Sequence, residues 1–106
     1  MFTTKQRSKL RSLAQNIEPI GQVGKGGISE NMLAGLSDAL DKRELIKVSL
    51  LNNNDDDIRD VAEELAENLN AEVVCTIGRK VVLYRYSEKD GAKHIEFYRA
   101  GVRLVW

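Results

Sequence analysis

The chain has 106 residues, of which 16 are basic and 16 acidic, and no apolar run in it approaches the roughly 20 residues that cross a bilayer. This length predicts a single domain. Because the N-terminus lacks the apolar region of a signal peptide, we expect the chain to stay in the cytoplasm. The zero net charge conceals an uneven distribution. Residues 1–28 contain five basic side chains and one acidic, residues 76–106 contain seven and three, and residues 50–75 contain one and eight. Local patches of charge therefore set the field that a charged ligand meets.

The first predicted element is a helix over residues 3–16. Thr3 and Gln6 have the spacing of a capping box at its start. At about 100° per residue, one face of this helix is apolar. Its members are Leu10, Leu13, Ala14 and Ile17. Basic side chains border the apolar face on both flanks, and they are Lys5 and Lys9 on one side and Arg7 and Arg11 on the other. Such flanks are most often plain solvated surface, but they can also bind phosphate groups.

A glycine-rich turn with a lysine at its tip follows a short predicted strand over residues 20–23. The turn consists of Gly24, Lys25, Gly26 and Gly27. Because glycine has no Cβ, these glycines can adopt positive φ and let backbone N–H groups approach a ligand closely. The next helix directs the positive end of its dipole the same way, so we expect the turn to hold phosphate.

The spacing of the glycines excludes both a P-loop and a dinucleotide-binding fingerprint. What remains is a G-x-x-G element of the kind that lies against nucleic-acid phosphates in KH-type RNA-binding domains. An ordinary turn between a strand and a helix would contain the same four residues, so the element alone does not decide between the two interpretations.

The rest of the chain alternates between helices and strands. Ser29 is the expected N-cap of a second helix that ends near Asp41. The elements predicted after it are a strand over residues 45–51, a polar turn over 52–57, a helix over 58–69, and a hairpin with strands over 73–77 and 81–86. The resulting order, α-β-α-β-α-β-β, predicts an α/β or α+β fold with one mixed four-stranded sheet packed with helices.

We expect residues 1–86 to form the domain and residues 87–106 to be a C-terminal extension. Residues 94–99 alternate enough to add an edge strand to the sheet, and the other possibility is a flexible tail. The single cysteine, Cys75, lies in an apolar run, which predicts a buried thiol and argues against disulfides, redox chemistry and thiolate metal sites.

Neither a metal site nor a catalytic site is expected. The run of acidic residues 55–57 lacks the glycine and glutamate spacing of an EF-hand loop, and helix capping explains it more simply. The only histidine, His94, lies in the extension, and no nucleophile with a nearby base can be named. We therefore expect no cofactor and no enzymatic activity.

Four motifs occur along the chain in a fixed order. They are TKQR and LRSLA within residues 4–14, VGKGGIS at 23–29, RELIKV at 43–48, and IGRKVVLYR at 77–85. With these motifs, residues 2–86 resemble the CRM domain (chloroplast RNA splicing and ribosome maturation), in the small stand-alone bacterial form of the YhbY-like proteins. The resemblance implies a fold similar to the C-terminal domain of bacterial translation initiation factor three.

The resemblance also implies a function, which is binding to the RNA of precursor large ribosomal subunits during ribosome assembly. The residues implied in RNA contact are those of the glycine turn together with Lys5, Lys9, Arg11, Arg7, Lys47 and Arg85. Lys47 and Arg85 could equally pair with Glu44 or another carboxylate nearby. We expect a monomer.

An alternative function follows from the acidic segment. The third predicted helix could dock a basic partner, such as a ribosomal protein, while the glycine turn is merely structural. The sequence does not identify the RNA or its specificity, and both functions could coexist on opposite faces of the domain.

Overall fold

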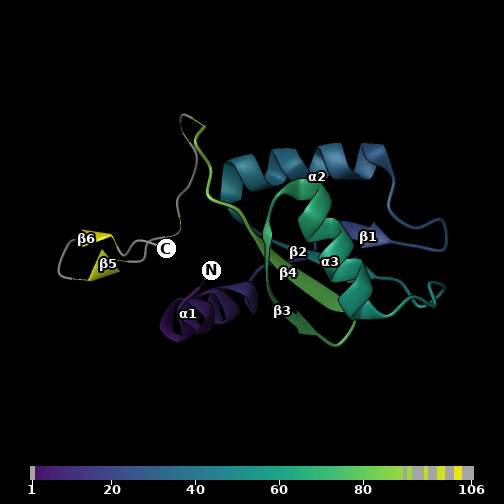
Figure 1. Ribbon diagram of the computed structural model, residues 1–106, viewed down its shortest axis with the longest axis horizontal. Coiled ribbons are helices and arrows are strands. Elements are labelled where there is room, and N and C mark those ends of the chain that lie inside the picture. Colours follow the sequence, from purple (N-terminus) through teal and green to yellow (C-terminus); the bar gives the residue numbers. More distant parts are fainter. Residues whose placement is uncertain (1, 90, 92–94, 96–97, 100–101, 104–106) are drawn as a thin grey trace.

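The computed structural model describes residues 2–89, 91, 95, 98–99 and 102–103. Three helices and a four-stranded sheet make up the domain (Figure 1). In chain order, the elements are α1 (Thr4–Ala14), β1 (Gly21–Val23), α2 (Glu30–Arg43), β2 (Leu45–Leu50), α3 (Ile58–Leu69), β3 (Glu72–Ile77) and β4 (Lys80–Tyr84). This order confirms the predicted α-β-α-β-α-β-β arrangement. None of the described helices is both long enough and apolar enough to cross a bilayer.

The strands lie in the order β1-β2-β4-β3, with β1 parallel to β2 and the other pairs antiparallel. The mixed four-stranded sheet is therefore confirmed. β3 and β4 form the predicted hairpin, whose turn contains Gly78 at a φ of 58°. Because β1 runs parallel to β2 and β4 runs against it, the end of β1, the end of β2 and the hairpin turn all lie at one end of the sheet.

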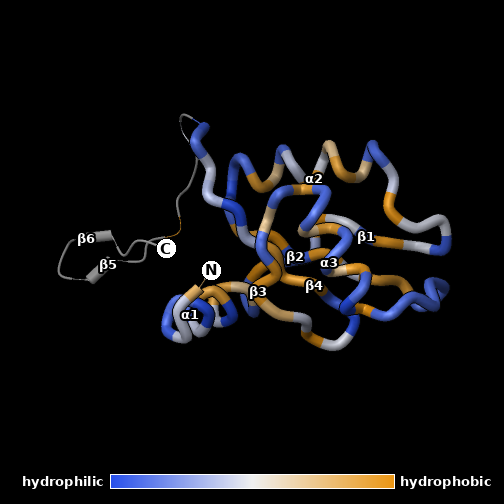
Figure 2. Tube along the Cα trace, in the orientation of Figure 1, coloured by the Kyte–Doolittle hydropathy of each residue, from blue (hydrophilic) through white to orange (hydrophobic). Residues whose placement is uncertain are grey.

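One face of the sheet is covered by α2 and α3, and the apolar strands lie between the layers (Figure 2). The core on this face contains Val23, Leu36, Leu40, Ile46, Val48, Leu50, Val61, Ala62, Leu65, Leu69, Val81 and Leu83. Each fully buried leucine contributes about 1.5–3 kcal/mol relative to an exposed one, so this layer dominates the stability of the domain.

The opposite face of the sheet is covered by α1 at one end only. Leu10 and Ala14 of α1 pack there with Leu45, Val82 and Tyr84. Figure 1 shows α1 at the left of the sheet and the β1–α2 and β2–α3 connections at the right. Since α1 meets only part of the face, its buried stripe is narrower than predicted: Leu13, placed on the apolar face by its spacing, is 36% exposed.

The helix ends follow the predicted capping chemistry. Thr3 and Gln6 form the capping box of α1, and the Ser29 hydroxyl accepts a hydrogen bond from the Met32 N–H at 3.1 Å. Asp57 caps α3 through the Arg59 N–H at 2.8 Å, as expected for the acidic run. α1 ends at Ala14, two residues before the predicted end, and α2 continues to Arg43.

The C-terminal extension contains two short strands, β5 (Tyr98–Arg99) and β6 (Val102–Arg103), which pair with each other in a separate two-stranded sheet. Of the predicted edge strand over residues 94–99, His94, Glu96 and Phe97 lie outside the described residues. Tyr98 and Arg99 pair with β6 and are not part of the four-stranded sheet.

Candidate functional site

The glycine turn is a tight turn closed by a hydrogen bond from the Gly27 N–H to the Gly24 carbonyl at 3.0 Å. Of its three glycines, only Gly27 has a positive φ, at 78°. The prediction that glycine is needed for positive φ therefore applies at Gly27 and not at Gly24 or Gly26. Lys25 and Gly26 are exposed, and a Cβ added to Gly26 would meet no atom within 4 Å. The tip of the turn is thus open to a ligand.

Asn54 holds this turn in place from the β2–α3 connection. Its side-chain amide donates to the Gly24 carbonyl at 2.8 Å, and its side-chain oxygen accepts from the Asp56 N–H at 2.8 Å. Asn54 is only 5% exposed. The two connections are joined a second time, because the Leu51 N–H donates to the Val23 carbonyl at 2.9 Å.

Arg79, in the hairpin turn, binds the same connection. Its guanidinium donates to the carbonyls of Leu50 at 3.2 Å, Leu51 at 2.9 Å and Asn54 at 2.7 Å. Three loops at one end of the sheet are therefore fastened to one another, and the glycine turn rests on this base. The sequence pattern indicates no role for Asn54 or Arg79, because an asparagine in a polar turn and an arginine in a hairpin are common in any surface loop.

The predicted cations of α1 lie at the other end of the sheet from the glycine turn (Figure 1). Lys5, Lys9 and Arg11 are exposed. Arg7 is half-buried: its guanidinium donates to the carbonyls of Val73, at 3.3 Å, and Val74, and lies 5.3 Å from the centre of the Phe2 ring. Arg7 thus ties α1 to β3, which is a contact that helical spacing could not indicate.

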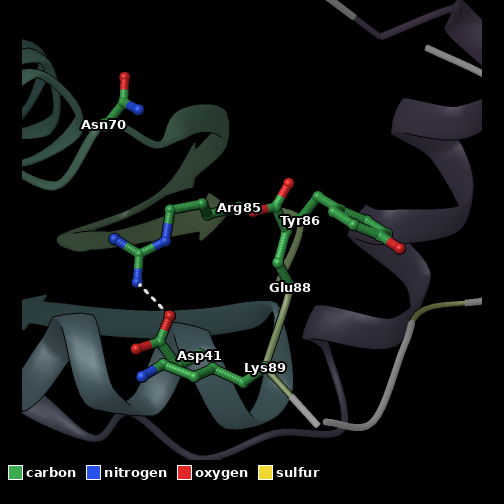
Figure 3. A pocket seen from close by; sticks show the side chains of 6 residues that line it. All are labelled: Asp41, Asn70, Arg85, Tyr86, Glu88 and Lys89. Carbon is green, nitrogen blue, oxygen red and sulfur yellow. Dashed lines mark hydrogen bonds and ion pairs between the residues drawn. The ribbon is translucent and has the colours of Figure 1, made fainter.

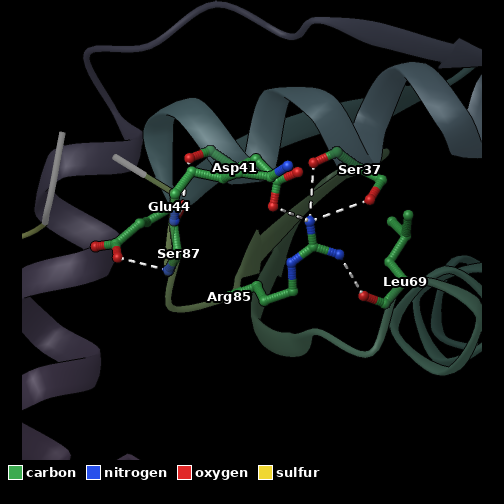
Figure 4. A network of polar contacts seen from close by, with 7 residues as sticks. Ser37, Asp41, Glu44, Leu69, Arg85 and Ser87 are labelled. Carbon is green, nitrogen blue, oxygen red and sulfur yellow. Dashed lines mark hydrogen bonds and ion pairs between the residues drawn. The ribbon is translucent and has the colours of Figure 1, made fainter. Parts of the chain in front are cut away.

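Arg85 lies on the α2 and α3 side of the sheet, away from the glycine turn. Its guanidinium donates to the carbonyl of Leu69 at 2.7 Å, to the carbonyl of Ser37 at 2.8 Å and to the carboxylate of Asp41 at 3.0 Å (Figure 4). The sequence left open a carboxylate partner for Arg85, and Asp41 is that partner. The pair lies in an open pocket of about 690 Å³ (Figure 3). The residues that line it are Asp41, Asn70, Arg85, Tyr86, Glu88 and Lys89.

Lys47 lies in the middle of β2, opposite Val82 of β4, on the face that carries α1. It is only 8% exposed. Its ammonium makes no hydrogen bond or ion pair with the described residues, and it is not fully buried. The aliphatic stem is therefore buried while the ammonium reaches the surface of the sheet.

Cys75 lies on the same face, since it pairs with Val82 from β3. The thiol is free and half-buried, which is less than the full burial predicted. Burial raises the pKa of the Cys75 thiol, and the nearby charges of Arg11, Arg7 and Lys47 oppose that rise. Two cations from α1 and one from β2 therefore act on the same thiol. In the described part of the chain, no group of three or more His, Cys, Asp and Glu side chains is arranged to hold a metal ion.

Residues 2–85 match the CRS1/YhbY (CRM) domain. The chain is 48% identical over 96 residues to the probable RNA-binding protein YqeI of Bacillus subtilis, a match that covers 91% of this chain and 98% of YqeI. It is 34% identical over 88 residues to an RNA-binding protein of Haemophilus influenzae, covering 83% of this chain and 89% of the relative.

A solved structure supports the fold independently. The solution structure of the hypothetical protein SAV1595 of Staphylococcus aureus superposes with a TM-score of 0.72 at 52% identity, covering 85% of this chain and 94% of that one. The matched residues of the family, 2–85, include all three helices and the whole four-stranded sheet.

Proposed function

This chain belongs to the CRS1/YhbY (CRM) domain family, and we propose that it binds RNA through the glycine turn and the exposed cations of α1. The observation that carries the proposal is the form of the turn: Lys25 stands exposed at its tip, and Gly26 leaves open space where any other residue would place a Cβ. A phosphate can therefore approach the backbone closely while the ammonium of Lys25 neutralises it. The RNA-binding names of two relatives favour the same ligand.

The residues take different parts in this proposal. Gly24, Gly26 and Gly27 shape the turn, and Lys25 supplies its charge. Lys5, Lys9 and Arg11 supply sequence-independent phosphate contacts from α1. Arg7 and Arg85, whose guanidinium groups already donate to main-chain carbonyls, contribute mainly by holding α1, α2 and α3 in position.

The proposed target is ribosomal RNA of the large subunit or its precursor, with a role in ribosome assembly. This target rests on the resemblance of the four motifs to the YhbY-like proteins. Sedimentation of the tagged protein through sucrose gradients, at low and raised salt, tests it. Salt-sensitive migration with a large-subunit precursor, lost in Lys25→Glu, is the expected result. Migration that survives both changes would instead indicate docking of a protein partner by the acidic α3.

Salt titration tests the phosphate contacts themselves. Contact with about four phosphates predicts that log affinity for single-stranded RNA falls with log salt at a slope near −3. Lys25→Gln should weaken binding and reduce the steepness of that slope by about 0.7, because one phosphate contact is lost. Lys42→Gln, which removes an exposed lysine at the end of α2, is the matched control. A Lys25→Gln protein with unchanged affinity and slope would remove Lys25 from the interface.

A further inference from the structure

A row of four side chains crosses the sheet on the face that carries α1, beyond the end that α1 covers. The strand register places Gln22 opposite Ser49, Ser49 opposite Lys80, and Lys80 opposite Ile77. Residues opposite one another on neighbouring strands point to the same face, and Ser49 shares its face with Lys47, two residues earlier. Gln22, Lys80 and Ile77 are exposed, and Ile77 is 41% exposed although apolar.

This row adjoins the glycine turn. Gln22 is the second residue of β1, two positions before Gly24, and Lys80 follows the hairpin turn that Arg79 fastens to the same group of loops. The β2–α3 connection, which is one of these loops, carries the exposed Asp55, Asp56 and Asp57 just before α3. The backbone of a nucleic acid held at the glycine turn is therefore repelled by the carboxylates on the α3 side and attracted toward the α1 side of the sheet.

The next row of the same face contains Lys47, Val82 and Cys75. The stem of Lys47 is buried, and its ammonium, which reaches the surface of the sheet, has no hydrogen-bond or ion-pair partner among the described residues. An ammonium that its buried stem holds at a fixed place on this face is suited to an anion that arrives from outside. Arg11 of α1 follows Leu10, which packs on this face, and its charge opposes the rise in the pKa of the Cys75 thiol in the same row.

We infer that this open face is the path of a single RNA strand, which leaves the glycine turn, crosses Gln22, Ser49 and Lys80, and reaches Lys47 and Arg11. The inference rests on the proposed function and adds the path and the form of the ligand. The two groups of predicted cations, at opposite ends of the sheet, become one interface. None of the side chains in the two rows is acidic.

The dimensions of the face favour a single strand over a duplex. From Leu50 to Leu45 the strand β2 spans roughly 17 Å, and α1 stands on the sheet at the far end of that distance. A path of this length holds about four nucleotides, comparable to the stretch that a G-x-x-G loop clamps in KH domains. No aromatic side chain belongs to the two rows, so phosphate contacts dominate and sequence preference is modest.

Binding of fluorescently labelled single-stranded RNAs of four and ten nucleotides, and of a ten-base-pair RNA duplex, tests this path. We expect the wild type to bind the ten-nucleotide strand more tightly than the duplex. Lys80→Gln should weaken binding of that strand several-fold and reduce the steepness of its salt slope by about 0.7. Lys47→Met, which keeps the buried stem and removes the charge, should have the same effect. Lys42→Gln is again the control, and urea unfolding verifies that each variant is folded.

Two outcomes would overturn the inference, and they differ from failure of the proposed function. If Lys80→Gln and Lys47→Met, both folded, bind with wild-type affinity and slope while Lys25→Gln is weakened, RNA binds the turn and does not cross the sheet. Tighter binding of the duplex than of the single strand would also exclude the path. If instead none of the three variants changes affinity, the proposed function itself fails.

Discussion

The glycines of the turn have separate physical tasks. Gly27 has a φ of 78°, a conformation that costs an L-residue with a side chain about 1–2 kcal/mol. Gly26 has no such requirement, and a Cβ there would meet no atom within 4 Å. Folding therefore explains why glycine is suited to position 27 and does not explain it at position 26. The close approach of a ligand to the backbone that is proposed above would explain it.

These two positions make a matched pair of variants. Gly27→Ala should lower the free energy of unfolding by about 1 kcal/mol because of its positive φ. Gly26→Ala should change that free energy by less than about 0.5 kcal/mol, yet weaken RNA binding, since its methyl group occupies the space that a phosphate would use. Urea unfolding and RNA titration of both proteins check this. Wild-type affinity in Gly26→Ala would show that RNA does not approach the backbone at the tip.

The surroundings of some charged side chains can be predicted from the sequence, and those of others cannot. Lys25 was expected at an exposed tip, because a lysine between glycines in a turn has nothing to pack against. Arg7 and Arg85 resembled it in sequence, but each reaches main-chain carbonyls more than ten residues away. Those carbonyls come into reach only when the sheet and helices assemble, so no local pattern reports them.

At the scale of elements, the glycine turn depends on two loops that lie far from it in sequence. Asn54 donates to Gly24, and Arg79 donates to the main chain around Asn54. Arg79 therefore acts on the turn through Asn54 and is a positioning residue in the proposed interface. Such a residue should affect how well the turn is held and leave the number of phosphate contacts unchanged.

Variants that remove the hydrogen bonds of Asn54 or Arg79 should weaken RNA binding without changing its salt dependence. Asn54→Ala leaves the Gly24 carbonyl without its buried donor and should lower the free energy of unfolding by about 1–2 kcal/mol. Its RNA affinity should fall while the slope of log affinity against log salt stays at the wild-type value. Arg79→Ala should behave in the same way. A slope reduced by about 0.7 in Arg79→Ala would mean instead that Arg79 itself contacts a phosphate.

Elements were predictable where local chemistry decides them. Thr3, Ser29 and Asp57 marked the starts of the three helices, since each cap bonds an N–H two or three residues away. The pairing of Tyr98 and Arg99 with β6 was not predictable, because alternation in residues 94–99 shows that a strand is possible without naming its neighbour. Leu13 was misplaced for a similar reason, as the extent of sheet available to α1 is a tertiary property.

For the whole molecule, the uneven charge of the sequence becomes a difference between two sides of the sheet. α3 covers the face of the sheet opposite α1, and its acidic residues are exposed: Asp60, Glu63, Glu64 and Glu67. Of these, Glu63 lines a pocket with Arg7 of α1 at the β3 edge. Counting charges by segment predicts that patches exist, while the packing of α1 and α3 on opposite faces of the sheet sets where they lie. In the proposed interface, a polyanion is therefore expected to bind with most of α3 directed away from it.

The C-terminal extension is fastened to the domain by Glu44, the residue that ends α2. This side chain is fully buried, and its carboxylate accepts the Ser87 N–H at 2.7 Å and the Ile95 N–H at 2.8 Å. The Ser87 bond is visible in Figure 4. Glu44 also has a φ of 64°, where glycine is the usual residue. The chain thus keeps a strained conformation at the end of α2, and the carboxylate bonds offset that strain.

Glycine substitutions at Glu44 and at Asn70, the residues that end α2 and α3 with a positive φ, separate the effect of backbone strain from that of the carboxylate bonds. Asn70 ends α3 with a φ of 52°, and it makes no hydrogen bond to the described residues of the extension. Asn70→Gly should therefore leave the free energy of unfolding unchanged or raise it by up to about 1 kcal/mol. Glu44→Gly gains the same conformational relief but leaves two N–H groups without their charged acceptor, so it should be destabilised by about 1–3 kcal/mol. Urea unfolding of the full-length variants, with hydrogen exchange at Ser87 and Ile95, measures both. Equal stability of the two variants, with unchanged exchange, would mean that the Glu44 carboxylate does not hold the extension.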